Sequence, residues 1–171
     1  MVETPDGFAI RPTRSMVRQA LFNVLADRVP DSRFLDLFAG AGTVGFEALS
    51  RGAASAVFVD SDRRAQSVIA RNAERFGCGK RCRTVHAEVA RWLRTGPREV
   101  PEADICFVDA PYRDPDVDTV LALLGDHPPP LVVCEHHRAR RLPDRLGELE
   151  RVRDINHGLT TLTFLQRTSE T

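Results

Sequence analysis

The pattern of apolar and polar positions predicts an alternation of helices and strands along most of the chain. The first segment has apolar residues at helical spacing, which predict one buried stripe on a helix: Val17, Ala20, Leu21, Val24 and Leu25. Five short segments then predict strands, at 33–39, 56–60, 83–87, 103–108 and 131–134, and the near-continuous apolar run at 56–60 predicts a strand covered on both faces. Helical patterns separate these segments, at about 43–51, before Phe76, around Trp92 and Leu93, and at about 116–124.

The order of these elements predicts an α/β fold built on one sheet. Strands that alternate with helices form parallel pairs joined by right-handed crossovers. Residues 148–154 and 160–166 differ, because their period-two alternation around Asn156-His157-Gly158 predicts an antiparallel hairpin. Gly96-Pro97 is expected to open a loop. We therefore expect one domain over residues 1–171, with a helical segment at 11–30 before a core at 31–171.

Composition narrows the class of protein. The 171 residues are 42% hydrophobic and 28% charged, as in soluble globular proteins, and no apolar run approaches the roughly 18 residues of a membrane span. The amino end lacks a basic and then apolar signal pattern, so a cytoplasmic location is expected. The net charge is zero, so the whole molecule has no polyanion-binding signature. Nearly all basic residues are arginines, which suits phosphate contacts but equally fits a bias in genome composition.

The cysteines do not predict a metal site. Cys106 and Cys134 lie inside apolar strand runs, where cysteine behaves as a small hydrophobic residue. Cys78 and Cys82 flank a short turn without a second pair of ligands nearby. We expect no bound metal and, in a reducing compartment, no disulfide.

The most informative run is Leu-Asp-Leu-Phe-Ala-Gly-Ala-Gly-Thr-Val-Gly-Phe at residues 35–46, where a strand breaks into a glycine turn and a helix begins. Its glycines, Gly40, Gly42 and Gly45, also fit the G-x-G-x-x-G pattern of dinucleotide-binding proteins. Asp36 argues against a dinucleotide, because an acid this close to the strand end would face a cationic group and not a pyrophosphate. S-adenosylmethionine (SAM) offers an ammonium and a sulfonium group and has no phosphate. The alternative role of Asp36 is to cap the turn.

Two more acids are expected beside this turn, because ligands of such sheets bind beyond the carboxyl ends of the strands. Asp60 ends the second strand and is predicted to accept hydrogen bonds from the ribose hydroxyls; its alternative role is a helix cap. Glu88 ends the third strand and is predicted to accept from the adenine amine; its alternative is a solvated residue in the first helical turn. The predicted cofactor site is completed by Phe38, Ala39, Ser61, Val89 and Asp109.

Asp109-Ala110-Pro111-Tyr112, at the end of the fourth strand, predicts the reacting centre. The lone pair of an exocyclic amine on a purine is delocalised into the ring. The Asp109 carboxylate and the Ala110 carbonyl would accept its two N–H groups and leave the lone pair free for the methyl group of SAM. Pro111 stiffens the turn, and Tyr112 is expected to stack on a base flipped out of its helix. The alternative is an ordinary strand-ending turn.

With both motifs in place, the chain resembles the SAM-dependent N-methyltransferases that carry a [DN]PP[YF] motif and, more narrowly, the RsmD family. This family methylates N2 of a guanine in bacterial small-subunit rRNA. The resemblance covers about residues 11–167 and is carried by Arg11-Pro12-Thr13, Val17-Arg18, Leu21-Phe22-Asn23, Asp36-Leu37-Phe38-Ala39-Gly40, Glu47-Ala48-Leu49-Ser50-Arg51-Gly52, Phe107-Val108-Asp109, Glu135-His136, and His157-Gly158 with Thr161-Leu162-Thr163-Phe164.

The resemblance implies a Rossmann-like class I methyltransferase fold, with a seven-stranded, mostly parallel sheet of strand order 3-2-1-4-5-7-6. It implies SAM as cofactor, S-adenosyl-L-homocysteine as product, and small-subunit rRNA as partner, within the 30S subunit or an assembly intermediate. Arg11, Arg14 and Arg18 would then contact RNA phosphates. The chain departs from the family in two places. Ala110 replaces the first proline of the motif, and the ten residues before Arg11 include no basic residue, where the family usually has a basic hairpin.

Three other functions stay open from the residues alone. The same chemistry could act on adenine N6 of DNA or RNA or on a protein glutamine, because each presents a similar nitrogen to Asp109. An NAD-dependent oxidoreductase would need an acid–base group that the sequence does not show. A SAM-binding or RNA-binding protein without turnover is the third, and Ala110 favours it slightly.

Overall fold

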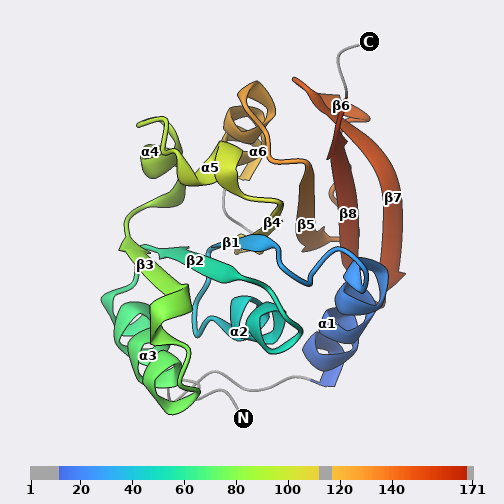
Figure 1. Cartoon of the computed structure of the whole chain (residues 1–171). Helices are drawn as coiled ribbons and strands as arrows, with labels where there is room; N and C mark the ends of the chain where they lie inside the picture. The colour runs from blue at the N-terminus through green and yellow to red at the C-terminus, as the bar shows by residue number, and fades with distance from the viewer. Residues whose placement is uncertain (1–11, 112–116, 169–171) are drawn as a thin grey trace.

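The computed structural model describes residues 12–111 and 117–168, with only the backbone for residues 12–14 (Figure 1). Along the chain the elements are α1 (Pro12–Leu25), β1 (Arg33–Leu37), α2 (Thr43–Ser50), β2 (Ser55–Asp60), α3 (Arg63–Arg75), the 3-10 turn η1 (Gly79–Arg81), β3 (Cys82–His86), α4 (Val89–Leu93), α5 (Glu99–Glu102), β4 (Ile105–Val108), α6 (Val117–Asp126), β5 (Leu131–His137), β6 (Arg145–Leu146), β7 (Leu149–His157) and β8 (Thr160–Arg167).

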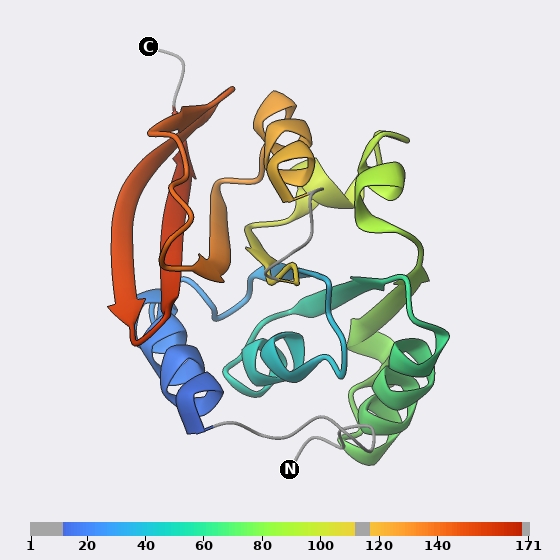
Figure 2. The same cartoon turned by 180° about the vertical axis from the view of Figure 1, so that it is seen from behind.

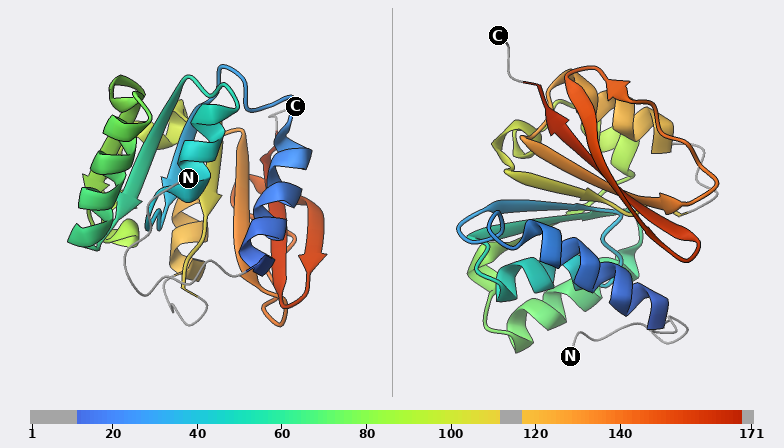
Figure 3. Two further views of the ribbon diagram at one scale, coloured as in Figure 1. Left: turned by 90° about the horizontal axis from the view of Figure 1, so that it is seen from below. Right: turned by 90° about the vertical axis from the view of Figure 1, so that its right-hand side faces the viewer.

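The strands form one sheet of eight, in the order β3-β2-β1-β4-β5-β8-β7-β6 (Figures 1 and 3). The first five are parallel, and β8, β7 and β6 add an antiparallel end. This confirms the predicted parallel sheet, its closing hairpin and its strand order. The eighth strand is the two-residue β6, which pairs with β7 and is too short to leave an alternating pattern in the sequence.

Helices cover both faces of the sheet, with α1, α2 and α3 on one side and α4, α5 and α6 on the other (Figures 1 and 2). Successive side chains of a strand point to opposite faces, so Phe34 joins the core under α1–α3 and Leu35 the core under α4–α6. Because both faces of β1, β2, β4 and β5 are largely buried, these strands are rich in apolar residues, whereas β3 ends the sheet and is partly exposed.

Three local features differ from the prediction. β1 ends at Leu37 and not at residue 39, because Phe38 adopts a left-handed conformation with φ of 62°. The expected loop after Gly96-Pro97 contains a single helical turn, α5. The hairpin turn lies at Gly158 and Leu159, with His157 paired to Thr160. In the part of the chain that the structure describes, no helix is long and apolar enough to cross a bilayer.

Candidate active site

The carboxyl ends of β2, β1 and β4 lie side by side and carry the predicted motifs. Leu37 of β1 is level with Val59 of β2 and Val108 of β4. The Ala39 amide donates to the Val59 carbonyl at 3.1 Å, and the Asp109 amide donates to the Leu37 carbonyl at 3.4 Å. The structure therefore brings the glycine loop, Asp60 and the Asp109 turn to one edge of the sheet.

The loop between β1 and α2 depends on backbone conformations that favour glycine. Phe38, Gly40 and Gly42 have φ of 62°, 55° and 75°, and a non-glycine residue in this region costs about 1–3 kcal/mol. A Cβ on Gly42 would lie 2.9 Å from the Phe46 ring, so packing also requires glycine there. A Cβ on Gly40 would meet no atom within 4 Å. Open space at Gly40 leaves room for a ligand against the backbone.

Asp36 is a buried acid that links β1 to the first turn of α2. Its side chain is 2% exposed, and Oδ2 accepts a hydrogen bond from the Gly45 amide at 3.0 Å. Burial raises the pKa of Asp36 well above its usual range, and the charges of Asp109 and Asp60 add to the rise, while the Gly45 hydrogen bond opposes it. Asp36 thus caps the turn, as its alternative role predicted. It also forms, with Asp60 and Asp109, an acidic site that favours a cation.

Asp60 ends β2 and accepts hydrogen bonds from the loop before α2 and from the loop before α3. Its Oδ2 accepts from the Gly40 amide at 2.8 Å, and its Oδ1 accepts from the Asp62 amide at 2.8 Å. The helix cap of α3 is Asp62, which accepts from the Arg64 amide, so Asp60 is not that cap. Each carboxylate oxygen can accept a further hydrogen bond, so the predicted contact with ribose hydroxyls is compatible with both loop contacts.

Glu88 caps α4 with both carboxylate oxygens. Oε1 accepts from the Ala90 amide at 2.7 Å and Oε2 from the Arg91 amide at 2.8 Å, and the side chain is exposed. This is close to its alternative role as an acid in the first helical turn, and its predicted contact with adenine stays a prediction. The Val89 side chain is buried in the core under α4–α6, while Ser61 is exposed and its carbonyl lies 2.9 Å from His86 Nε2.

The Asp109 turn is described up to Pro111. Asp109 is half-buried, Ala110 is 4% exposed, and Pro111 is exposed. The Asp109 amide bonds to the Leu37 carbonyl, so the turn lies beside the end of β1 that leads into the glycine loop. Tyr112, predicted to stack on the base, lies outside the described residues.

Of the three arginines predicted to contact RNA, the structure describes the side chain of Arg18. Arg11 lies outside the described residues, and Arg14 is described only by its backbone in α1. Arg18 forms an ion pair with Glu47 of α2, and Arg51 pairs with the same carboxylate. The Arg18 pair joins α1 to α2, which gives this arginine a structural role.

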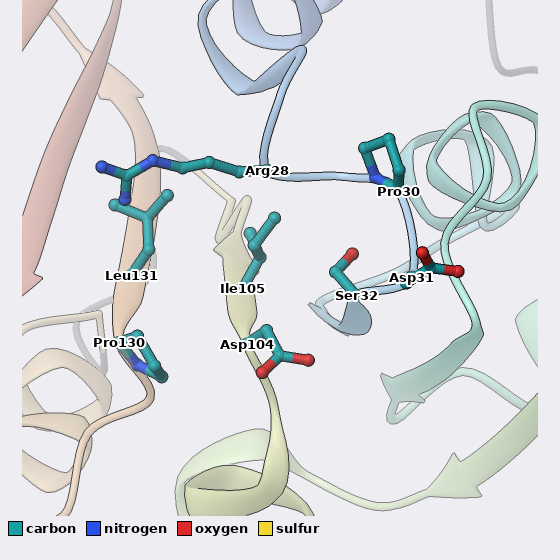
Figure 4. Close-up of a pocket in the computed structure, with 8 residues that line it drawn as sticks. All are labelled: Arg28, Pro30, Asp31, Ser32, Asp104, Ile105, Pro130 and Leu131. Atoms are coloured by element: carbon teal, nitrogen blue, oxygen red, sulfur yellow. The ribbon is translucent and has the colours of Figure 1, made fainter.

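A pair of cysteines and a pocket at the amino ends of the strands are two further candidate sites. Cys78 and Cys82 have their sulfur atoms 3.6 Å apart, and among the described residues no third His, Cys, Asp or Glu completes a metal-binding group. A pocket of about 400 Å³ lies at the opposite edge of the sheet, near the amino ends of β1, β4 and β5 (Figure 4). None of its lining residues belongs to the predicted site.

Sequence reasoning missed a second polar pocket, at the carboxyl end of β5 beside β8. His136 and Arg138 are among the residues that line it. A signal was present, since residues 138–145 contain four arginines and a single acid. Its position next to the Asp109 turn could not be read from that signal.

Comparison with known proteins decides the family. A family model described as "Conserved hypothetical protein 95" matches residues 1–166. Ribosomal RNA small subunit methyltransferase D of Escherichia coli is 37% identical over 123 residues, which cover 72% of this chain and 60% of that protein. YlbH of Bacillus subtilis is 30% identical and matches 94% of this chain and 90% of its own length. The chain belongs to the RsmD family.

Solved structures agree with this RsmD-family membership. The methyltransferase yhhF of Escherichia coli has a TM-score of 0.85 and 31% identity, and the match covers 99% of this chain and 92% of that one. The RNA methyltransferase of Salinibacter ruber, solved with S-adenosyl-L-homocysteine, shares the fold alone, with a TM-score of 0.68, 19% identity, and coverage of 94% and 96%. The protein therefore has the fold of class I SAM-dependent methyltransferases.

Proposed function

We propose that this RsmD-family protein transfers a methyl group from SAM to the exocyclic N2 of a guanine in small-subunit rRNA. The relative from Escherichia coli carries a name that assigns it to small-subunit rRNA. The observation that carries the proposal is the common edge formed by the glycine loop and the Asp109 turn, joined through the Asp109 amide and the Leu37 carbonyl. A donor and an acceptor bound on either side of this contact would meet at the Asp109 carboxylate.

The residues at the edge fit SAM better than a dinucleotide. Asp36, Asp60 and Asp109 concentrate negative charge at this edge, which favours a cationic ligand over a pyrophosphate. A buried carboxylate with a raised pKa gains from a nearby positive charge. SAM supplies an electrophilic methyl group and brings that charge. The open space at Gly40 allows the cofactor to approach the backbone.

The chain's own residues then prepare the acceptor amine. The Asp109 carboxylate and the Ala110 carbonyl accept hydrogen bonds from the two N–H groups and hold the nitrogen lone pair towards the methyl carbon. SAM, when bound, would supply the methyl group and keep the electron pair of its S–C bond on sulfur. The proton released from nitrogen passes to Asp109 or to water. Ala110 keeps the acceptor carbonyl that proline would supply, so the substitution in the motif leaves this step intact.

The experiment that tests the function is methyl transfer to small ribosomal subunits that lack the modification. Tritiated SAM, nuclease digestion and mass spectrometry of the labelled nucleoside identify the methylated atom. N2-methylguanosine is expected. Detection of N6-methyladenosine would show that the methylated base is adenine. Detection of methylglutamine in a ribosomal protein would show that the substrate is a protein and not RNA.

A further inference from the structure

A polar pocket adjoins the candidate active site on the sheet face that carries α6. Its volume is about 440 Å³, and its walls come from the segment after β5 and from β7 and β8. Figure 2 shows the segment between β5 and β6 crossing in front of β8. Four arginines line the pocket, against the two aspartates Asp144 and Asp154: Arg138, Arg140, Arg141 and Arg151. We refer to it as the arginine pocket.

A hydrogen-bonded chain forms the floor of the arginine pocket. Thr163 of β8 donates to Asp154 Oδ1 of β7 at 2.7 Å, and His136 Nε2 of β5 lies 2.8 Å from the Thr163 hydroxyl. Thr163 is 1% exposed and His136 is 6% exposed. The chain crosses three adjacent strands, so the floor is held in one arrangement.

The four arginines divide into two pairs with different roles. Arg140 pairs with Asp118 of α6 at 2.9 Å, and Arg151 pairs with Asp144 and Asp154, so these two hold the pocket together. Arg138 and Arg141 are exposed, and within the described part of the chain neither guanidinium pairs with a carboxylate. Two guanidinium groups at a polar pocket therefore remain available for an external anion.

The arginine pocket lies directly beside the Asp109 turn. Val108 of β4 is level with Cys134 of β5, so Asp109 and His136 follow on neighbouring strands. The Arg140–Asp118 ion pair connects the pocket to the first turn of α6, the helix that follows the Asp109 turn. Adjacent strands are about 4.8 Å apart, so β8 lies roughly 10 Å from β4, a distance on the scale of a few nucleotides.

The charge of the active-site edge favours a separate basic site for binding a polyanion. Asp36, Asp60 and Asp109 gather at this edge and make it acidic. This acidity favours a cationic cofactor but repels RNA. Arg18, which was expected to contact RNA, is paired with Glu47. Among the described residues, the arginine pocket offers a basic site next to the reacting edge that can attract phosphate.

We propose that Arg138 and Arg141 bind backbone phosphates of the RNA strand that carries the target base, and that Arg140, Arg151 and the His136–Thr163–Asp154 chain position the segment that presents them. This inference rests on the proposed function, because it takes RNA as the substrate. Phosphate contacts of this kind set the position of the strand and the affinity without reading its sequence.

The test compares two double variants that remove the same charge. Arg138→Gln/Arg141→Gln alters the pocket. Arg28→Gln/Arg94→Gln is the matched control, because both residues are exposed and without a described ion pair, and Arg28 lies at the opposite edge of the sheet (Figure 4). Binding is measured by fluorescence anisotropy with a labelled hairpin from small-subunit rRNA, and with isolated small subunits, over a series of salt concentrations.

The pocket variant should bind both probes more weakly and with less dependence on salt. For single-stranded RNA each phosphate contact contributes about 0.7 to the slope of log affinity against log salt concentration. One contact therefore raises the affinity about 5-fold at 0.1 M salt relative to 1 M salt. Loss of both contacts predicts a Kd about 25-fold higher and a slope lower by about 1.4, with the control within about 2-fold of wild type. Arg138→Lys/Arg141→Lys should retain most of the binding, because it keeps both charges.

A pocket variant that binds both probes with the wild-type Kd and salt slope would overturn the inference. Calorimetry with SAM checks the fold independently, and its Kd should be unchanged in every variant. The same RNA, assayed for methyl transfer, separates the two proposals. Arginine-dependent binding without N2-methylguanosine would contradict the proposed reaction but support the phosphate site. A wild-type protein that binds neither probe would overturn both.

Discussion

Asp60 holds the glycine loop through Gly40, whose amide donates to Asp60 Oδ2 at 2.8 Å. One carboxylate at the end of β2 therefore fixes the backbone against which the cofactor is proposed to lie, and its other oxygen fixes the Asp62 amide. An acid in this place acts on the ligand both directly and through the loop.

Replacing Asp60 should weaken SAM binding with little effect on catalysis by the bound complex. Asp60→Ala removes hydrogen bonds to a charged acceptor, each worth about 1.5–3 kcal/mol, so Kd should rise roughly 10-fold to 150-fold in calorimetry. Asp62→Ala is the control, because it removes the cap of α3 and costs about 1 kcal/mol of stability without reaching the loop. An unchanged Kd in Asp60→Ala would show that the ribose of SAM does not bind at Asp60.

Asp36 should make the stability of the unliganded protein depend on pH. Its folded pKa lies above the unfolded value, so its contribution is fully present below about pH 4 and is lost as the pH rises through the folded pKa. Asp36→Asn keeps an acceptor for the Gly45 amide and removes the buried charge. The variant should have a higher Tm than wild type at pH 8, by about 2–4 °C for each kcal/mol gained, and the difference should vanish towards pH 4.

The same substitution should weaken SAM binding at pH 8 by about 10-fold, the loss expected for one charged contact of ~1.5 kcal/mol. A carboxylate that is stabilised by the bound cation also releases a proton on binding, so wild-type affinity should increase with pH and the affinity of Asp36→Asn should not. If the two proteins showed the same pH profile for SAM binding, Asp36 would be a structural cap alone.

Asp109 should be required for methyl transfer and not for cofactor binding. Asp109→Asn replaces an acceptor-only group by one that also donates, which places N–H against N–H at the acceptor amine. Transfer to small subunits should fall at least 100-fold, as for loss of a positioned catalytic group, while the Kd for SAM stays within a few-fold. The matched control is Asp104→Asn, at the other end of β4, where Asp104 pairs with Arg33 near the surface. Activity that persists in Asp109→Asn would refute the assigned role.

Gly40 should be needed for the ligand more than for the fold. Gly40→Ala introduces a Cβ that meets no protein atom, and the left-handed backbone costs about 1–2 kcal/mol. Gly77→Ala is matched in both respects, with φ of 63° and open space, but follows α3 away from the loop. Both variants should lose similar stability in urea unfolding. Only Gly40→Ala should bind SAM more weakly, and equal affinities would show that the space at Gly40 is not the ligand site.

The sequence predicted the elements whose burial leaves a regular pattern. Parallel strands covered on both faces read as continuous apolar runs, so Phe34 and Leu35 face different cores yet both belong to one recognisable strand. It also predicted which acids meet at the sheet edge, because that follows from strand order. β6 and α5 were missed, since two to four residues are too few to show a period.

Features that depend on tertiary contacts could not be predicted from the sequence. Arg18 and Glu47 are 29 residues apart in the sequence, and only the packing of α1 against α2 shows that they form an ion pair. The capping of α4 by Glu88 and the hydrogen bond from Gly45 to Asp36 require knowing where each carboxylate points. The three arginines of residues 138–141 can be read from the sequence, but their placement at the pocket beside β8 depends on the path of the chain after β5.

The cluster of Asp36, Asp60 and Asp109 has a consequence for the end of the catalytic cycle. Methyl transfer turns a sulfonium into a neutral thioether, so the spent molecule no longer compensates the three carboxylates as well as the fresh one did. On the proposed function, product release is assisted by the repulsion that the reaction restores, and exchange for a new SAM is favoured at each turnover.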